Sequence, residues 1–297
     1  MTEPEIGTAT GLVERYAAAL VSAVPGQPED DGYFGPGSVT WRLSGDLSAP
    51  VAGLRSVLMQ ALHPLAMAGV DQHSDWRRDP VGRLAATASY TATVTYAGRA
   101  AADRAAGRVR KIHSHVRGVD TVTGRPYAAG DPALLLWVHA ALVDSVLAAC
   151  ELVGTPPTAA DADQFVAEMA IAAELLGVPR EIIPASAAEL QAYIDGVRPE
   201  LRRTPAAAES MGYMLDPAGM GEEVAELWQD IRDAAVAALP HWARDLYGYP
   251  APPAITAERR NEIRQTLGVF DAVFLGEPGV LEARQALTVR MRSARQG

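Results

Sequence analysis

The chain has 297 residues, 48% of them hydrophobic, which is typical of a folded globular protein and argues against disorder. Its formal net charge of −10 argues against a nucleic-acid-binding protein, because phosphate contacts need clustered Lys and Arg side chains. The single cysteine, Cys150, excludes an internal disulfide and any multi-cysteine metal cluster. It lies in an apolar stretch, so we expect a buried and unreactive thiol.

No run of the sequence predicts export or a membrane span. The first residues, MTEPEIGTATGLVERY, contain early acidic residues and no long apolar run, unlike a secretory signal. No segment approaches the roughly 20 apolar residues that a membrane-spanning helix needs. We therefore expect a cytoplasmic protein without membrane contact, and the apolar composition permits a homodimer.

Helices separated by Gly and Pro account for most of the sequence, whereas no pair of strand-like segments with a hairpin signal is found. Pro64 is expected to break a helix near His63, because proline lacks a backbone donor and clashes with the preceding turn. Asp-Pro pairs at residues 79–80 and 131–132 each predict a helix start. Helices are predicted over residues 8–23, 53–68, 79–98, 108–117, 131–154, 159–176, 186–200, 220–247, 256–269 and 280–295. The predicted fold class is all-α, with one multi-helix domain spanning residues 1–297.

The segment DPALLLWVHAALVDSVLAACELVG is apolar on nearly every side, which is typical of a helix buried at the centre of a domain. It also contains His139 and Asp144, whose burial costs free energy unless each finds a partner. Two explanations for Asp144 stay open, because it could orient a metal-bound histidine or form a salt bridge with a core arginine. His63 and His73, in QALHPLAMAGVDQHSDW, are further candidates to line a cavity.

The stretch VRKIHSHVRG carries two histidines within a segment predicted to be helical. Helical geometry places Val109, Ile112 and Val116 on one apolar stripe. His113 lies beside this stripe, whereas His115 points about 200° away from His113. The two rings therefore cannot bind one metal ion from this helix, because a helical pair needs a spacing of four residues. We expect His113 to face the core edge and His115 to face solvent.

Arg110 and Arg117 lie three residues before and four residues after His113, on the same face of the predicted helix. A buried histidine between two arginines suits a planar anionic ligand such as haem, with the imidazole on iron and the guanidiniums on the propionates. The alternative is a core-edge histidine that bonds a backbone carbonyl while the arginines extend into water. The residue pattern alone leaves both interpretations open.

A polar line precedes this segment in GRLAATASY, where Arg83, Thr87 and Tyr90 fall at helical positions i, i+4 and i+7. Small alanines at positions 85, 86 and 88 would let another body approach this face closely. A cation beside a hydroxyl could bind a small oxidant or a substrate oxygen. The alternative is an exposed polar stripe without a ligand.

Four elements in this order, HPLAMAGVDQHSDW, DPVGRLAATASY, VRKIHSHVRGV and YAAGDPALLLWVHAALVDS, resemble the catalytic domain shared by rubber oxygenase (latex-clearing protein) and the MpaB-type oxygenases. The resemblance is densest over residues 34–154. It implies an all-α fold that holds b-type haem, with His113 as the iron ligand and with Arg83 and Thr87 on the opposite side of the haem. In rubber oxygenases a lysine just before that threonine can cap the iron. Here the position is Ala86, which argues against long-chain polyisoprene as the substrate.

We therefore expect a haem b-dependent oxygenase or oxidase that acts on a small organic molecule and uses dioxygen or peroxide. In the expected site His113 binds iron, and Arg110 or Arg117 pairs with a propionate. Arg83 and Thr87 donate hydrogen bonds to bound oxygen. The second hypothesis is a non-catalytic helical protein that binds haem or another small ligand, which the departure at position 86 keeps open.

Overall fold

The computed structural model describes residues 30–216, 222–249 and 255–275, together with residues 285, 288–290 and 292. The helix predicted over residues 8–23 and most of the helix predicted over residues 280–295 lie outside these described residues. The described elements are α2 (Val39–Ser44), α3 (Ala49–Ala61), α4 (Pro64–His73), α5 (Pro80–Tyr96), α6 (Arg99–His113), β1 (Arg117–Val119), β2 (Pro126–Ala128), α7 (Pro132–Leu152), α8 (Ala159–Glu174), η1 (Arg180–Ile182), α9 (Ala187–Val197), η2 (Arg198–Glu200), α10 (Pro205–Leu215), α11 (Glu222–Ala238), α12 (His241–Tyr247) and α13 (Ala257–Leu275).

Helices make up nearly all of the regular structure in the described residues, so the all-α prediction is confirmed. The prediction of no hairpin is wrong, because β1 and β2 form a two-stranded antiparallel sheet. Arg117 pairs with Ala128, and the connecting turn contains Gly124 with a φ of +71°. Strands of three residues are too short to show an alternating pattern, and the Gly-containing turn was their only signal.

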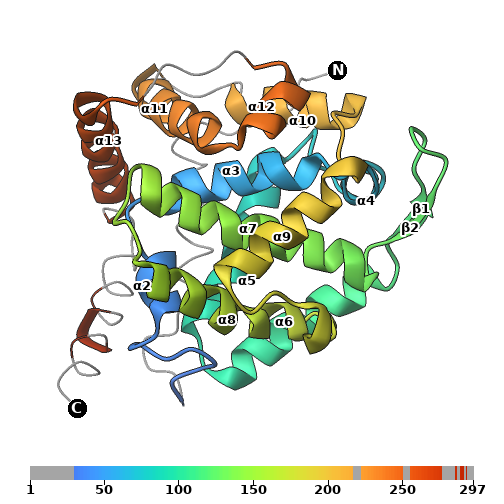
Figure 1. The fold of residues 1–297 in the computed structure, drawn as a ribbon, viewed down its shortest axis with the longest axis horizontal. Coiled ribbons are helices and arrows are strands. Elements are labelled where there is room, and N and C mark those ends of the chain that lie inside the picture. The colour runs from blue at the N-terminus through green and yellow to red at the C-terminus, as the bar shows by residue number, and fades with distance from the viewer. Residues whose placement is uncertain are drawn as a thin grey trace.

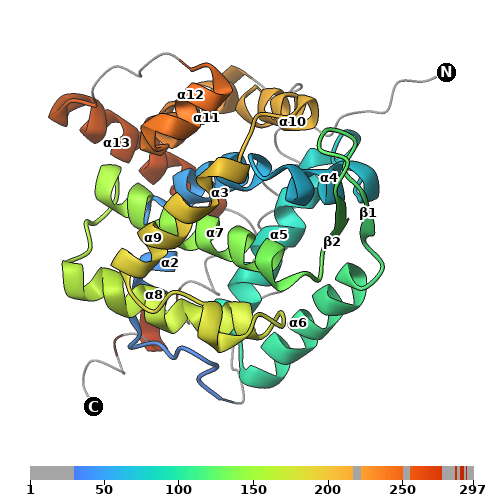
Figure 2. The ribbon, with the colours of Figure 1, turned by 45° about the vertical axis from the view of Figure 1, so that its right-hand side comes forward.

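Helices α3 and α7 pack along each other at the centre of the molecule (Figures 1 and 2). On one side of this pair, α11 contacts both helices and α13 packs against α11. On the other side, α8 and α9 contact α7, and α2 packs against α8. The fold is therefore layered around α7, as its apolar sequence on every side predicted.

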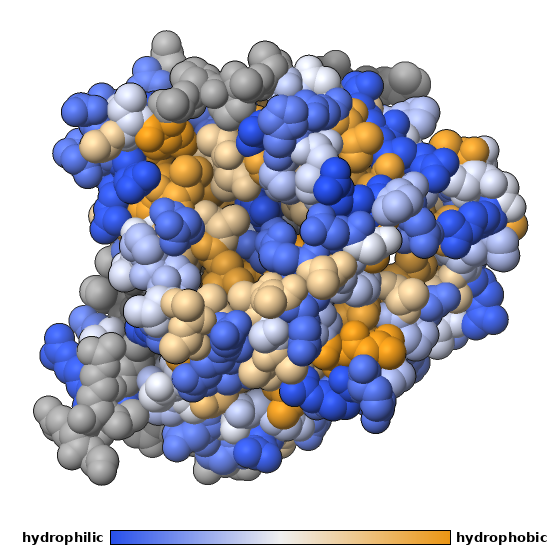
Figure 3. Space-filling model, viewed as in Figure 1, coloured by the Kyte–Doolittle hydropathy of each residue, from blue (hydrophilic) through white to orange (hydrophobic). Residues whose placement is uncertain are grey.

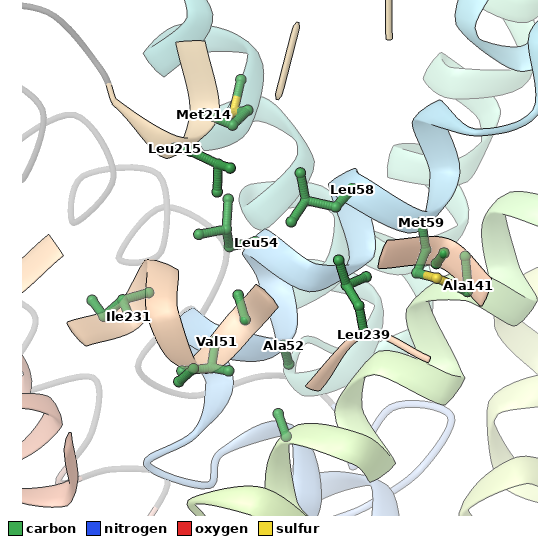
Figure 4. Close-up of a cluster of buried hydrophobic side chains, with 14 of the residues drawn as sticks. Val51, Ala52, Leu54, Leu58, Met59, Ala141, Met214, Leu215, Ile231 and Leu239 are labelled. Carbon is green, nitrogen blue, oxygen red and sulfur yellow. The ribbon is translucent and has the colours of Figure 1, made fainter. Parts of the chain in front are cut away.

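The two largest apolar clusters of the described residues meet at α7. The larger one joins α3 and α7 to α10, α11 and α13, and Figure 4 shows labelled side chains of α3, α7, α10 and α11 directed toward one another. The second cluster joins α7 to α2, α8 and α9 and includes the fully buried Phe165. Cys150 belongs to this second cluster, and burial raises the pKa of its thiol to about 11. The expected buried thiol is therefore confirmed.

Helix α7 is the one described helix that is long and apolar enough to cross a membrane by length and composition, with a mean hydropathy of 1.9 in its most apolar window. This finding corrects the expectation that no segment approaches such a span. In the structure 61% of that window is buried, and α7 packs against α3, α8, α9 and α11. Its apolar sequence is thus accounted for by its position in the core.

Prolines set several helix boundaries. Helix α4 begins at Pro64, separate from α3, so the predicted break near His63 is confirmed. His63 caps α4, because its Nδ1 accepts from the Ala66 amide at 3.5 Å. The single helix predicted over residues 220–247 is wrong, because Pro240 separates α11 from α12. Two described helices, α2 and α10, were not predicted at all.

Candidate functional site

Helix α5 presents Arg83, Thr87 and Tyr90 on one face, because their spacing follows the helical repeat. Arg83 and Thr87 are exposed, and Tyr90 is half-buried. Thr87 Oγ1 donates to the Arg83 carbonyl at 3.1 Å, within the helix. Ala86, next to Thr87, is also exposed, and its methyl group covers little of this face.

The Arg83 guanidinium is accessible to solvent but makes no hydrogen bond or ion pair with the described residues. Surrounding protein atoms nevertheless desolvate it, and this desolvation lowers its pKa. Arg83 therefore brings to the surface of α5 a positive charge that has no partner among the described residues.

His113 is the last residue of α6 and is half-buried. Desolvation lowers the pKa of its imidazole, and the positive charge of Arg83 lowers it further. The ring is therefore neutral near pH 7, which leaves one nitrogen free to bind a metal. Its side chain makes no hydrogen bond within the described part of the chain. Arg83 on α5 and His113 on α6 therefore interact electrostatically.

The hydroxyl of Tyr90 belongs to the same group of unpartnered side chains. It is buried, and no described residue accepts or donates a hydrogen bond to it. Desolvation raises the pKa of Tyr90 to about 12, although the positive charge of Arg110 acts in the opposite direction. Sequence reasoning placed Tyr90 on the Arg83 face but assigned it no role, since a missing hydrogen-bond partner is visible only after folding.

The structure separates the two arginines expected to flank His113. Arg110 remains on α6, and its guanidinium donates to the Leu175 carbonyl at the end of α8. Helix α6 ends at His113, so Arg117 lies in β1 and donates to the Ser114 carbonyl instead. The expectation that Arg117 shares a helical face with His113 is therefore wrong.

The early end of α6 also changes the predicted apolar stripe. Ile112 is 62% exposed, which is contrary to the expected position in the core, while Val109 and Val116 are half-buried. His115 is exposed, as expected, and its Nδ1 lies 2.8 Å from the Lys111 carbonyl. This contact competes for a carbonyl that a longer helix would use, which accounts for the end of α6.

The three other candidate histidines have different surroundings. His139 on α7 is half-buried and makes no hydrogen bond with the described residues, and desolvation lowers its pKa to about 4. His63 is buried, and desolvation, the largest cause, lowers its pKa, while its ring caps α4. His73 is exposed, and its Nε2 lies 3.2 Å from the Arg117 carbonyl. Only His139 resembles His113 in being desolvated and unpartnered.

Asp144 belongs to a separate and fully paired cluster. Its Oδ2 accepts from Arg55 Nη2 at 2.7 Å, and its Oδ1 accepts from Gln191 Nε2 at 2.7 Å. Arg55 also donates to Ser145 Oγ at 2.7 Å and to the Ala238 carbonyl at 2.8 Å. The salt bridge to a core arginine is therefore the correct explanation of this buried carboxylate.

The two helices that carry the unpartnered groups pack mainly against each other. Helices α5 and α6 share an extensive contact, whereas their contacts with α7 and α8 are sparse. Figure 2 shows α6 at the lower right edge of the fold, with α5 nearer the centre of the view. Within the described ranges, no three His, Cys, Asp or Glu side chains come close enough to hold a metal ion together.

One of three comparisons with known proteins found a match. Searches among curated proteins and among solved structures found no match. Residues 41–272, more than three quarters of the chain, match the family described as ER-bound oxygenase mpaB/B'/Rubber oxygenase, catalytic domain. The matched range includes α5, α6 and α7 and all the candidate residues above. The chain therefore belongs to the mpaB and rubber oxygenase catalytic-domain family.

Proposed function

We propose that this protein is a haem b-dependent oxygenase or oxidase that acts on a small organic molecule and uses dioxygen or peroxide. Membership of an oxygenase family supports oxidative chemistry in general. The observation that carries the finer proposal is the set of desolvated groups without internal partners, Arg83, Tyr90 and His113. Such groups cost folding free energy and are retained where a ligand supplies the missing interactions.

The residues present fit a haem in three respects. His113 offers a neutral imidazole, the protonation state that an iron ligand needs. The Tyr90 hydroxyl is a buried donor without an acceptor among the described residues, and a propionate carboxylate would accept a hydrogen bond from it. Arg83 is a cation without a carboxylate partner, and it suits either a propionate or an oxygen atom that carries negative charge. Arg110 would hold a propionate only if it released the Leu175 carbonyl.

Haem, when bound, supplies the one-electron and dioxygen chemistry that side chains cannot perform. The contribution of the chain is to bind this group through His113 and to place donors where negative charge develops on oxygen. Arg83 is already free to donate, whereas the Thr87 hydroxyl must first turn away from the Arg83 carbonyl. The exposed methyl group of Ala86 leaves space beside Thr87 for a small substrate.

His113→Ala, with His115→Ala as the matched control, tests the iron ligand. Both histidines lie at the end of α6, but His115 is exposed and lies near the Lys111 carbonyl. Purification from haem-replete cells should give parent and His115→Ala proteins with a strong absorption band near ~400 nm. The His113→Ala protein should lose this band and keep its helical circular dichroism. A colourless parent protein, or a His113→Ala protein that retains haem, would refute the assignment.

Arg83→Gln and Thr87→Val test the donors to oxygen. Both variants should retain haem and turn over more slowly, with the rate reduced by roughly 10²–10³ if the lost donor acts on the transition state. The parent should also change its absorption spectrum when peroxide is added, or when dithionite is followed by air. A haem-loaded parent that responds to neither treatment would instead be the non-catalytic haem protein.

A further inference from the structure

The outer face of α6 carries a line of cations. Arg104, Arg108 and Lys111 occupy positions i, i+4 and i+7, so they project from one side of the helix. All three are exposed, and Ile112 lies on the same side with 62% of its surface exposed. We call these four residues the basic face.

The cations of the basic face have no partners in the described part of the chain. None of Arg104, Arg108 and Lys111 forms an ion pair or side-chain hydrogen bond with the described residues. In contrast, Arg42 and Arg77 lie outside α6 and the hairpin and pair with carboxylates at 2.6 and 2.7 Å. The basic face thus keeps its full positive charge available to an outside partner.

Positive charge is also concentrated along the chain in this region. Residues 99–128, which comprise α6 and the hairpin, hold seven Lys or Arg and two Asp, a local net charge of +5. The whole chain has a net charge of −10, so the remaining residues carry −15. An anionic partner would therefore be attracted to this side of the molecule and repelled by the rest.

The hairpin that follows α6 adds exposed apolar side chains. Val119 in β1 is 54% exposed, and Val122 in the turn is 49% exposed. The hairpin projects from the body of the protein (Figure 1), and Figure 3 shows apolar residues among hydrophilic ones at this edge. The sheet is held against α4, because Gln72 Nε2 donates to the Val119 carbonyl at 3.0 Å. The hairpin is therefore anchored to the body of the protein through β1.

We propose that the basic face and the adjoining hairpin bind the surface of an anionic lipid bilayer. Unpaired cations bind lipid phosphates, and Ile112, Val119 and Val122 can enter the apolar boundary below them. Nucleic acid or an acidic protein would use the cations as well, but phosphate contacts leave these projecting aliphatic side chains without a role. The expectation of no membrane contact came from the lengths of apolar runs, which do not show how charge is distributed over the surface.

The binding is tested with the full-length protein and lipid vesicles in a sedimentation assay. At low salt the parent should sediment with vesicles containing about one-third phosphatidylglycerol and should stay in solution with pure phosphatidylcholine vesicles. The triple variant Arg104→Gln, Arg108→Gln, Lys111→Gln should bind roughly 100-fold more weakly, because each cation near a charged bilayer contributes roughly fivefold. High salt should have a similar effect on the parent.

A matched control carries the same change of charge elsewhere. Arg78, Arg203 and Arg260 are exposed and lie outside α6 and the hairpin, and their triple change to Gln should leave vesicle binding within about twofold of the parent. Ile112→Ser should weaken binding several-fold at unchanged charge. Equal losses in both triple variants would overturn the proposal, and so would a parent that ignores anionic vesicles or that binds duplex nucleic acid through the same three cations. The assay requires neither haem nor turnover, so it stands independently of the proposed function.

Discussion

Two groups of polar side chains in this protein differ in whether they have hydrogen-bond or ion-pair partners. In the Arg55–Asp144 cluster, the guanidinium donates to three partners and the carboxylate accepts from two. Around His113, the imidazole, the Arg83 guanidinium and the Tyr90 hydroxyl have no partner in the described part of the chain.

The presence or absence of partners distinguishes a structural role, for the Arg55–Asp144 cluster, from a ligand-binding role, for the groups around His113. A desolvated polar group that is fully paired stabilises one arrangement of the helices around it. An unpartnered group costs free energy in the isolated protein, and this cost is recovered when a ligand binds. The same type of substitution should therefore have opposite consequences in the two places.

The largest effect on stability is expected for Arg55→Met. This change leaves the Asp144 carboxylate buried with Gln191 as its remaining partner, and the loss of one member of a buried ion pair costs about 3–5 kcal/mol. Urea unfolding followed by circular dichroism measures the change. A loss below about 1 kcal/mol would show that the cluster is not a structural element, and the comparison would then fail.

The next largest effect concerns His139 and pH. Its folded pKa of about 4 lies below the ordinary value of 6.5, so between these values the unfolded chain binds a proton that the folded chain does not. Stability should therefore fall as the pH is lowered from 6.5 toward 4, by at most roughly 3 kcal/mol from this residue. Unfolding of the haem-free protein at several pH values measures the slope.

His139→Gln should flatten that slope, and His115→Gln serves as its control because the latter ring is exposed. If both variants keep the slope of the parent, His139 is not a desolvated neutral group.

Haem binding to the parent should also steepen the dependence of stability on pH, since a ligand held by His113 competes with a proton for the same nitrogen.

A smaller effect of opposite sign is expected for Tyr90→Phe. The change removes a buried hydroxyl without a partner, so the haem-free protein should gain about 1 kcal/mol of stability. The haem-loaded variant should instead retain its haem less firmly than the parent, because it lacks the hydroxyl that donates to the ligand in the parent. A destabilised haem-free protein would indicate that the hydroxyl already has an internal role.

The smallest effect on stability is expected for Arg83→Gln. The side chain is exposed and makes no ion pair, so the haem-free protein should change by no more than about 0.5 kcal/mol. Together with slower turnover, this result would give the pattern of a binding residue, in contrast to Arg55→Met. Thermal unfolding of the two variants side by side makes the comparison direct.

Much of the helical order follows from local features of the sequence. Pro64 and the Asp-Pro pairs at residues 79–80 and 131–132 mark helix starts that the structure contains, because proline geometry acts on its own turn. Errors arose where the signal was weak or interrupted. The three-residue strands showed no alternation, and α6 ended at His113 although the apolar spacing continued to Val116.

The sequence alone predicts the all-α class and the central position of α7, because helical periodicity and apolar content are local properties. It also selects Arg83, Thr87 and His113 as residues of interest. Tertiary structure decided which polar groups found partners. Asp144 pairs with Arg55, which lies 89 residues away in the chain, whereas the Tyr90 hydroxyl on α5 has no acceptor among the described residues. Hydrogen bonds and desolvation depend on contacts between segments that are distant in the chain, and a local sequence pattern does not predict those contacts.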